Sequence, residues 1–317
     1  MLLASSYHNL LLRGNEFLGW GKNEQGQLGM FHTRCVTVPT SIPILFNPLS
    51  ITSIKCHKYG SLVLTDGGIA YESGIIYNVK CELYEFKKCE VENITKIECG
   101  SNFNAIISNN HVFCWGQGIF DIVGYRDTYH KIPVEFVQNI YCGGSFVLIS
   151  TGNALWIWGR YGSTTVDPLQ IDLIKLHFNT ENITDIKCCC DGIIIIVEKN
   201  GKTIIYASFD GSLFQNIDYD YTNPKIFSNP IDNFFTILLD MPDGNTFIGK
   251  IDDSLTISKM YISEQTILDV VASPIGNYYL TNSKLLCGSK ENLVVHAHNN
   301  AMFPYYVKSA RSNIVME

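Results

Sequence analysis

Short apolar runs separated by polar turns recur along the chain. Two stretches align residue by residue, ITKIECGSNFNAIISNNHVFCWG at 94–116 and VQNIYCGGSFVLISTGNALWIWG at 137–159. Each contains an apolar run, a turn of small residues, a second apolar run, a polar turn and an aromatic run that ends in Trp-Gly. Runs of this length, rich in β-branched and aromatic residues, predict three consecutive strands. Because long helix-period stripes are absent, the pattern predicts an all-β fold.

The same outline recurs more faintly in the rest of the chain. The residue just after the first turn serves as a landmark, and its spacing between copies ranges from 40 to 52 residues: Asn9, Ser61, Asn104, Val147, Ile193, Asn233 and Asn277. Four short strands with their turns fill such a period, which is one blade of a β-propeller. The repeats are therefore expected near 1–50, 51–93, 94–136, 137–182, 183–225, 226–266 and 267–304. The faint copy at 226–249 leaves six or eight blades open.

A cut-off eighth copy, YYVKSARSNIV at 305–315, ends the chain. An open ring of blades would leave an unpaired strand edge, and pairing the two ends of the chain removes it. We therefore expect a single domain over 1–317, a seven-bladed β-propeller closed by pairing of the N- and C-terminal segments, with 305–317 as the closing strand.

Composition narrows the possible partners. The chain is 46% hydrophobic and carries a net charge of −7, from 30 acidic against 23 basic residues. Binding to nucleic acid depends on clustered Lys and Arg, so this balance argues against a nucleic-acid partner. Apolar runs stay shorter than the roughly 18 residues that cross a membrane, so we expect no membrane insertion.

The 11 cysteines show no pair of C-x-x-C motifs, which argues against zinc. Several lie inside apolar runs, among them Cys99, Cys142 and Cys188. We expect these three to be buried thiols at equivalent positions, in a protein of a reducing intracellular compartment, cytoplasm or nucleus.

The most specific motif is GWGKNEQGQLG at 19–29, followed by Pro39 and Pro43. Together with the periodic Trp-Gly pairs, it resembles the RCC1 repeat (regulator of chromosome condensation). Glycine supplies positive φ in tight turns and tryptophan fills the space between blades, so the motif residues are expected to be structural. Gln27 is expected to hydrogen-bond the backbone of a neighbouring blade. The structural set is Trp20, Gly21, Gly26, Gln27, Gly29, Trp115, Gly116, Trp158 and Gly159.

The resemblance also implies a partner class. The family includes guanine nucleotide exchange factors for small GTPases, with the Ran exchange factor as founder. Its exchange activity relies on acidic and histidine side chains in the Gly-x-x-His turns and on a wedge after one Trp-Gly. In this chain two turns keep a histidine and two keep an acid, whereas the turns at Gly100 and Gly143 have lost both. The resulting candidate binding residues are His8, His57, Ser101, Asn102, Ser145, Asp191 and Asp232, with Phe120 and Asp121 at the wedge position.

The sequence thus favours a protein-interaction platform in a regulatory assembly. The alternative is an exchange factor for a small, Ran-like GTPase, which performs no bond chemistry of its own. We expect no catalytic residue or cofactor, because residues 208–212, which faintly resemble the Asp-box turn of propeller glycosidases, suit an ordinary hairpin turn. We expect no metal site, because His296 and His298 lack a third ligand. Equivalent turns of a propeller gather on one face, so the candidate residues predict a partner face there.

Overall fold

The computed structural model describes residues 2–5, 7–74, 84–116, 129–152, 154–162, 174–176, 182–219, 222–228, 230–241, 246–263, 267–271, 277–281, 285–288, 308–310 and 313–315. The chain divides into two compact units, Met1–Thr180 (the N-terminal unit) and Glu181–Glu317 (the C-terminal unit). Within these described ranges, no helix has the length and apolar character needed to cross a membrane.

The N-terminal unit contains sixteen of the strands and one 3-10 turn. They are β1 (Leu2–Ser5), β2 (His8–Arg13), β3 (Glu16–Gly21), β4 (Val36–Ser41), η1 (Pro48–Ser50), β5 (Ile51–His57), β6 (Gly60–Thr65), β7 (Ala70–Gly74), β8 (Lys87–Lys88), β9 (Ile94–Cys99), β10 (Phe103–Ser108), β11 (His111–Gly116), β12 (His130–Ile132), β13 (Val137–Cys142), β14 (Phe146–Thr151), β15 (Leu155–Gly159) and β16 (Ile174–Leu176).

The C-terminal unit continues the series with strands only, among its described residues. They are β17 (Ile183–Cys188), β18 (Gly192–Lys199), β19 (Lys202–Phe209), β20 (Gln215–Ile217), β21 (Thr222–Phe227), β22 (Phe235–Asp240), β23 (Thr246–Ile251), β24 (Ile257–Ser263), β25 (Ile267–Val271), β26 (Asn277–Thr281), β27 (Leu285–Gly288), β28 (Lys308–Ala310) and β29 (Asn313–Val315).

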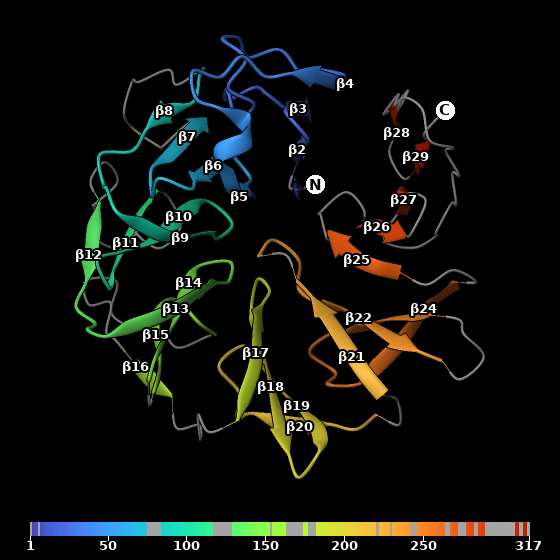
Figure 1. Ribbon diagram of the computed structural model, residues 1–317. Helices are drawn as coiled ribbons and strands as arrows, with labels where there is room; N and C mark the ends of the chain where they lie inside the picture. Colours follow the sequence, from blue (N-terminus) through green and yellow to red (C-terminus); the bar gives the residue numbers. More distant parts are fainter. Residues whose placement is uncertain are drawn as a thin grey trace. The chain divides into compact units, whose positions relative to one another are not determined.

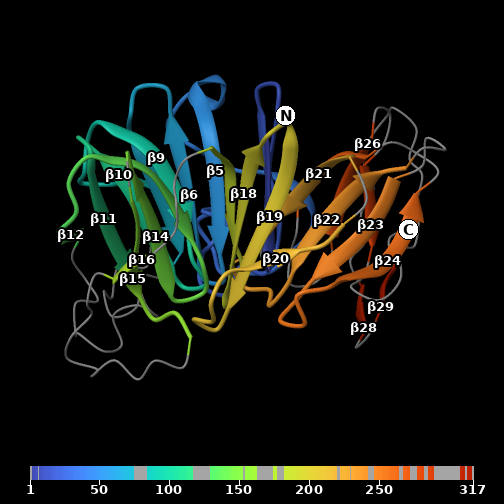
Figure 2. The ribbon, with the colours of Figure 1, turned by 90° about the horizontal axis from the view of Figure 1, so that it is seen from below.

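Consecutive strands pair antiparallel, as the sequence pattern predicts. Sheets β1–β4, β5–β8, β9–β12 and β13–β16 form the N-terminal unit; β17–β20, β21–β24, the three-stranded β25–β27 and the pair β28–β29 follow in the C-terminal unit (Figure 1). Figure 2 shows β9, β10 and β11 next to one another within one such sheet. The sheets of the N-terminal unit adjoin through their first strands, β1 with β5, β5 with β9 and β9 with β13.

The strand pairing differs from the expected closure of the ring. The first sheet takes all four of its strands from the first 41 residues, with β1 paired to β2. The late strands β28 and β29 pair with each other. The place that the C-terminal segment was expected to fill in the first sheet is thus taken by β1, and the described strands form no closed sheet. Most of residues 305–317 lie outside the described residues.

The strand register repeats between sheets. In five sheets the landmark residue pairs with the tryptophan of the Trp-Gly pair or with the residue at the equivalent position. Examples are Asn9 with Trp20, Asn104 with Trp115 and Val147 with Trp158. The two faint copies were aligned wrongly: Asn233 precedes β22 altogether, and Asn277 pairs one position later, with Gly288. The segments between their first and second strands are longer than in the clear copies, which shifts the landmark position.

The core lies between neighbouring sheets rather than inside any one of them. Trp115 packs in a cluster with Leu62 and Leu64 of the preceding sheet, and Trp158 packs with Ala105 and Cys114 in the same way. The tryptophans therefore fill the space between sheets, as predicted. Cys99, Cys142 and Cys188 are buried, form no disulfide and each end a first strand, which confirms that prediction; Cys56 is buried one residue before the end of β5.

In six of the described sheets, one buried ring closes the end where the first strand turns into the second. Phe103 and Phe146 occupy this place in their sheets, each opposite the glycine of the Trp-Gly pair. Their rings cover the start of the turn so closely that a Cβ on Gly100 or Gly143 would overlap them. His8 has the same register, opposite Gly21.

Two sheets supply this ring from another strand. In the second sheet the second-strand position is Gly60, and the His57 ring fills the space, with Nε2 2.6 Å from where a Cβ of Gly60 would stand. In the sheet β17–β20 that position is Gly192, and the ring comes from Phe209 of the third strand. The six rings His8, His57, Phe103, Phe146, Phe209 and Phe235, each at most 6% exposed, are called the end rings below.

The glycine opposite the end ring has a backbone that other residues rarely adopt. Gly21, Gly116 and Gly159, together with Gly74, which pairs with Gly60 beside the His57 ring, share φ values between 102° and 115°. A Cβ on Gly116 would stand 2.8 Å from both the Asn102 carbonyl oxygen and the Phe103 Cα. Positive φ and a crowded Cβ position thus exclude a side chain together.

We expect Gly116→Ala to lower the free energy of unfolding by about 3 kcal/mol or more, since strain and overpacking add. Gly14→Ala is the matched control, because Gly14 has φ 60° with nothing within 4 Å of its Cβ position. Backbone strain alone predicts about 1 kcal/mol there. Urea unfolding of both variants measures the difference, and equal losses would show that crowding at the turn contributes nothing.

One acid is buried between the second and third sheets. Glu72 is 7% exposed, and its Oε2 accepts a hydrogen bond of 2.8 Å from Trp115 Nε1. Burial raises the pKa of Glu72 to about 7, although the hydrogen bonds from Trp115 and Tyr129 oppose the shift. The folded protein therefore binds a proton here between pH 4.5 and 7 that the unfolded chain does not.

A raised carboxyl pKa makes the folded state less stable as pH rises through this window. Glu72→Gln keeps an acceptor for Trp115 and removes the titration. The unfolding free energy of the variant minus that of the parent should increase by about 2 kcal/mol from pH 5 to pH 8. Urea unfolding at both pH values measures this gain, and a stability difference that stays constant with pH contradicts the assignment.

Candidate functional site

The turns between first and second strands are tied to one another by their backbones. In the N-terminal unit the Lys58 N–H donates to the Ser101 carbonyl at 3.0 Å, and the Ser101 N–H donates to the Gly144 carbonyl at 3.1 Å. In the C-terminal unit the Cys190 N–H donates to the Asp232 carbonyl at 2.7 Å. Equivalent turns of neighbouring sheets thus form a continuous row in each unit, which fixes their positions.

The loop between β3 and β4 joins the same row. Gln27 Nε2 donates to the Lys58 carbonyl at 3.4 Å, and the Gln27 carbonyl accepts from the hydroxyls of Ser61 and Ser73 at 2.8 Å each. Within the loop, Asn23 Oδ1 accepts the Leu28 N–H at 2.9 Å. The predicted contact of Gln27 with a neighbouring sheet's backbone is therefore present.

The side of the sheets that carries these turns is called the turn face. The sequence predicts seven of the described residues on it, and they divide into two groups. Ser101, Asn102, Ser145 and Asp191 are partly exposed in the turns, where a partner can reach them. His8, His57 and Asp232 are 0%, 4% and 2% exposed, so their side chains lie beneath the face. Phe120 and Asp121, the expected wedge, lie outside the described residues.

The two histidines are buried because they serve as end rings. His8 Nε2 lies 2.6 Å from the hydroxyl of Ser61, which itself donates to the Gln27 carbonyl. Burial lowers the pKa of His8 to about 3, with a smaller effect from His57, and burial lowers the pKa of His57 to about 4. Both rings are therefore neutral near pH 7 and contribute packing and hydrogen bonds rather than surface charge.

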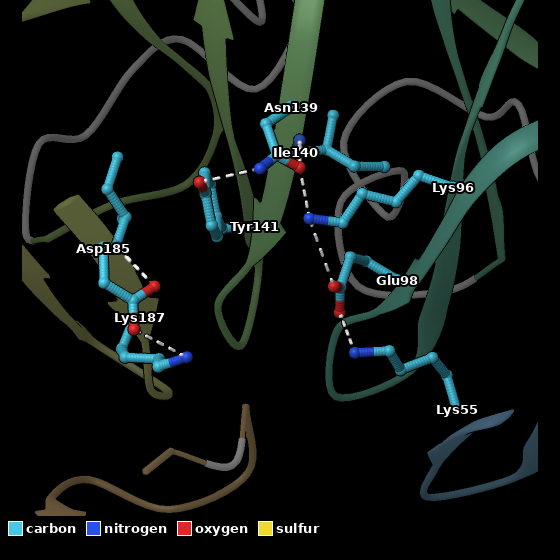
Figure 3. Close-up of polar contacts among 9 residues, drawn as sticks. Lys55, Lys96, Glu98, Asn139, Ile140, Tyr141, Asp185 and Lys187 are labelled. Carbon is cyan, nitrogen blue, oxygen red and sulfur yellow. Dashed lines mark hydrogen bonds and ion pairs between the residues drawn. The ribbon is translucent and has the colours of Figure 1, made fainter. Parts of the chain in front are cut away.

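A polar network that sequence reasoning missed lies on the first strands β5, β9 and β13 (Figure 3). The Glu98 carboxylate lies 2.9 Å from the ammonium of Lys55 and 3.6 Å from the ammonium of Lys96. Lys96 also donates to Asn139 Oδ1 and lies 4.6 Å above the Tyr141 ring. Asn139 Nδ2 in turn donates to the Tyr141 hydroxyl at 2.9 Å. Side chains from three sheets are thus joined side by side.

The single carboxylate of this network serves two lysines unequally. Burial opposes the charge on Lys55, but the charge and hydrogen bond of Glu98 outweigh it and raise the pKa of Lys55. Burial lowers the pKa of Lys96, and Glu98 offsets this only in part while Lys55 adds to it. The network carries two positive charges against one negative charge, a local balance opposite to that of the whole chain.

The aligned copies contain a signal for this network. First strands read ITSIKC, ITKIEC, VQNIYC and ITDIKC, so the third and fifth positions are polar while the fourth and sixth are apolar. Alternation places the polar pair on the face away from the core. The C-terminal unit repeats the pattern with Lys187 and Asp185, whose charged groups lie 3.0 Å apart (Figure 3).

Metal-binding chemistry has no counterpart in the part of the chain that the structure describes. No three His, Cys, Asp or Glu side chains there come close enough together to hold an ion. The polar sites consist of ion pairs, amides and hydroxyls, groups that recognise other polar and charged molecules.

Comparison with known proteins matches one repeat and the fold. Residues 16–64 match the family model of the regulator of chromosome condensation (RCC1) repeat. This segment contains the GWGKNEQGQLG loop and the second sheet's first two strands. No curated protein sequence matches the chain.

Solved structures resemble most of the chain at low identity. Human WBSCR16 has a TM-score of 0.65 and 16% identity, over 86% of this chain and 84% of that one. Prp20p from Saccharomyces cerevisiae, in a structure reported with its binding to Gsp1p and histones, has a TM-score of 0.67 and 14% identity, over 86% and 80%. Yeast RCC1 (Prp20) bound to Kap60 has the same TM-score and 13% identity, over 91% and 80%. Residues 16–64 therefore contain an RCC1 repeat, and the likeness to these structures shows that the chain has an RCC1-like β-propeller fold.

Proposed function

We propose that this protein is an interaction platform that binds a partner protein through its turn face. The observation that carries the proposal is the row of turns tied by backbone hydrogen bonds, Lys58 to Ser101 and Ser101 to Gly144. Such a row costs little ordering entropy on binding, because its backbone is already fixed. Loops held on a rigid scaffold are the usual place for binding residues.

The exposed side chains on this row differ from sheet to sheet while the parts beneath them stay alike. Every end ring is buried, and the glycines opposite three of them share one backbone conformation. Above this constant layer the turns present Lys58 and Tyr59 in one sheet, Ser101 and Asn102 in the next, and Ser145 in the third. This variety supplies specificity without changing the scaffold.

One of the two acids expected on the turn face is buried, and another acid takes its place in the proposal. Asp191 is partly exposed and remains in the proposed site of the C-terminal unit. Asp232 is buried, whereas Asp210 is exposed and its N–H donates to the Asp191 carbonyl at 2.9 Å. We therefore propose Asp191 and Asp210 as the acids offered to a partner.

The structural neighbours support a protein partner. The structure of Prp20p is reported with Gsp1p and histone binding, and yeast RCC1 (Prp20) was solved bound to Kap60. We further propose that the six four-stranded sheets and the three-stranded sheet β25–β27 are seven blades of one ring. The described cysteines form no disulfide, which supports a place in a reducing compartment, cytoplasm or nucleus.

The platform is tested by blocking the turn face. We expect Asn102→Trp with Ser145→Trp to weaken binding to a partner recovered from the protein's own cells by about tenfold or more, because two bulky rings obstruct the row. The matched control is Asp66→Trp with Gln138→Trp, which places two rings at exposed positions at the other end of the sheets. Titration of the purified partner by interferometry gives both affinities. Loss of binding in the control alone would assign the opposite end as the site.

Exchange on a small GTPase is the second candidate, favoured by the likeness to Prp20p and its reported binding to Gsp1p. An exchange factor stabilises the nucleotide-free GTPase, so it accelerates release of bound GDP. If the protein is one, adding it to purified Ran-like GTPases loaded with fluorescent GDP should speed release at least tenfold, and the Asn102→Trp, Ser145→Trp variant should lose this effect. Unchanged release rates across those GTPases, with intact partner binding, would leave only the platform.

A further inference from the structure

Three basic side chains lie along the turn row of the N-terminal unit. Lys58 stands in the turn between β5 and β6, and its N–H starts the row of hydrogen bonds to Ser101 and Gly144. Lys22 and Arg160 follow the glycines that end β3 and β15. The Lys22 N–H donates to the Tyr7 carbonyl at 3.0 Å, and the Arg160 N–H donates to the Ser145 carbonyl at 2.8 Å. Each basic residue therefore lies in, or is hydrogen-bonded through its backbone to, the turn between the first and second strands of a sheet.

Hydrogen bonds also connect the first of these turns to the second. Gln27 Nε2 reaches the Lys58 carbonyl, and Gln27 Oε1 accepts the Gln25 N–H at 2.9 Å in the loop that Lys22 begins. The three basic residues thus lie on one continuous stretch of surface rather than on separate parts of the unit. Lys22 and Arg160 are exposed, and Lys58 is partly exposed.

An aromatic ring accompanies each cation. The ammonium groups of Lys22 and Lys58 each lie 5.0 Å from a ring centroid, that of Tyr7 and that of Tyr59 respectively. Next to Arg160, the Tyr161 ring packs against the end ring Phe146 at 4.8 Å. Tyr and Arg are enriched at the centres of protein interfaces, where the ring supplies apolar area and the cation supplies direction. The set Lys22, Lys58, Arg160, Tyr7, Tyr59 and Tyr161 is called the basic row.

The basic row is not a consequence of the repeat. The chain as a whole has a net charge of −7. In the C-terminal unit the position equivalent to Lys22 and Arg160 is Asp210, which makes the same backbone bond, to Asp191. Glu24, two residues after Lys22 in the sequence, is an exposed acid. The same scaffold position therefore carries opposite charges in the two units, so the side chains there do not follow from packing.

We propose that the basic row binds an acidic segment of a partner polypeptide, with carboxylates on the three cations and apolar side chains on the tyrosines. This deepens the proposed function and rests on it. A nucleic acid fits less well, because three cations neutralise few phosphates and the protein's net negative charge repels a polyanion. A peptide strand with a few carboxylates offers matching charge and the apolar area that the three rings require.

The test uses a short fluorescent peptide rich in Glu and Phe, with the full-length protein at low salt. We expect saturable binding, and we expect the variant Lys22→Glu, Lys58→Glu, Arg160→Glu to weaken it by about tenfold or more, since three exposed charge pairs are reversed. The control variant Lys87→Glu, Lys88→Glu, Lys131→Glu reverses three exposed charges on the outer strands β8 and β12 and changes net charge equally. It should bind like the parent, with thermal unfolding showing that both variants are folded.

Three results would overturn the inference: equal weakening in both variants, equal binding of the same peptide with Gln in place of Glu, or tighter binding of a single-stranded DNA oligonucleotide. The first means that net charge alone is measured, and the third assigns the row to phosphate. If the peptide fails while the tryptophan variants still block the recovered partner, the platform stands without its acidic ligand. Failure of both experiments rejects the turn face itself.

Discussion

The structure depends on a steric match at one end of five described sheets, where a buried ring requires the absence of a neighbouring Cβ. Phe103 and Phe146 cover the turns that begin at Gly100 and Gly143. The opposite glycines, Gly116 among them, adopt positive φ and carry no side chain that would strike the turn carbonyl. Burying one aromatic ring contributes on the order of 2–3 kcal/mol, and the match brings each turn to the same place. Backbone bonds between turns follow from that common position.

Two variations on this match show how closely the space is filled, whereas the sheet β21–β24 departs from it with Phe235 opposite Ile251. Where the second strand supplies Gly60, the ring comes from His57; where it supplies Gly192, the ring comes from Phe209. The space is filled each time, although the residue that fills it moves from strand to strand. A histidine in this space is desolvated and neutral, as the lowered pKa values of His8 and His57 show. The histidines that resemble a binding signature in the sequence are part of the core in this protein.

The described neighbouring sheets share no strand ladder, so the backbone bonds between turns and the packed side chains join them. Apolar clusters around Trp115 and Trp158 do so in the interior, and the network of Lys55, Glu98, Lys96 and Asn139 does so along the first strands. The ion pairs are partly exposed and contribute little stability individually, but the network joins the first strands β5, β9 and β13. Because contacts beneath the turns hold the first strands side by side, the turn side chains can differ between sheets. The same scaffold therefore carries the basic row in one unit and Asp210 in the other.

The sequence alone determined the strands, the Trp-Gly register in the clear copies, the buried thiols and the role of Gln27, because these depend on local periodicity and on one specific loop. It also identified the exposed turn residues Ser101, Asn102 and Ser145. Only the tertiary structure decided that His8, His57 and Asp232 are buried, and that Lys55, Lys96 and Asn139 meet across three sheets. The physical reason is that burial and contact depend on which side chains share a space. Residues some forty positions apart share it only after the sheets have packed.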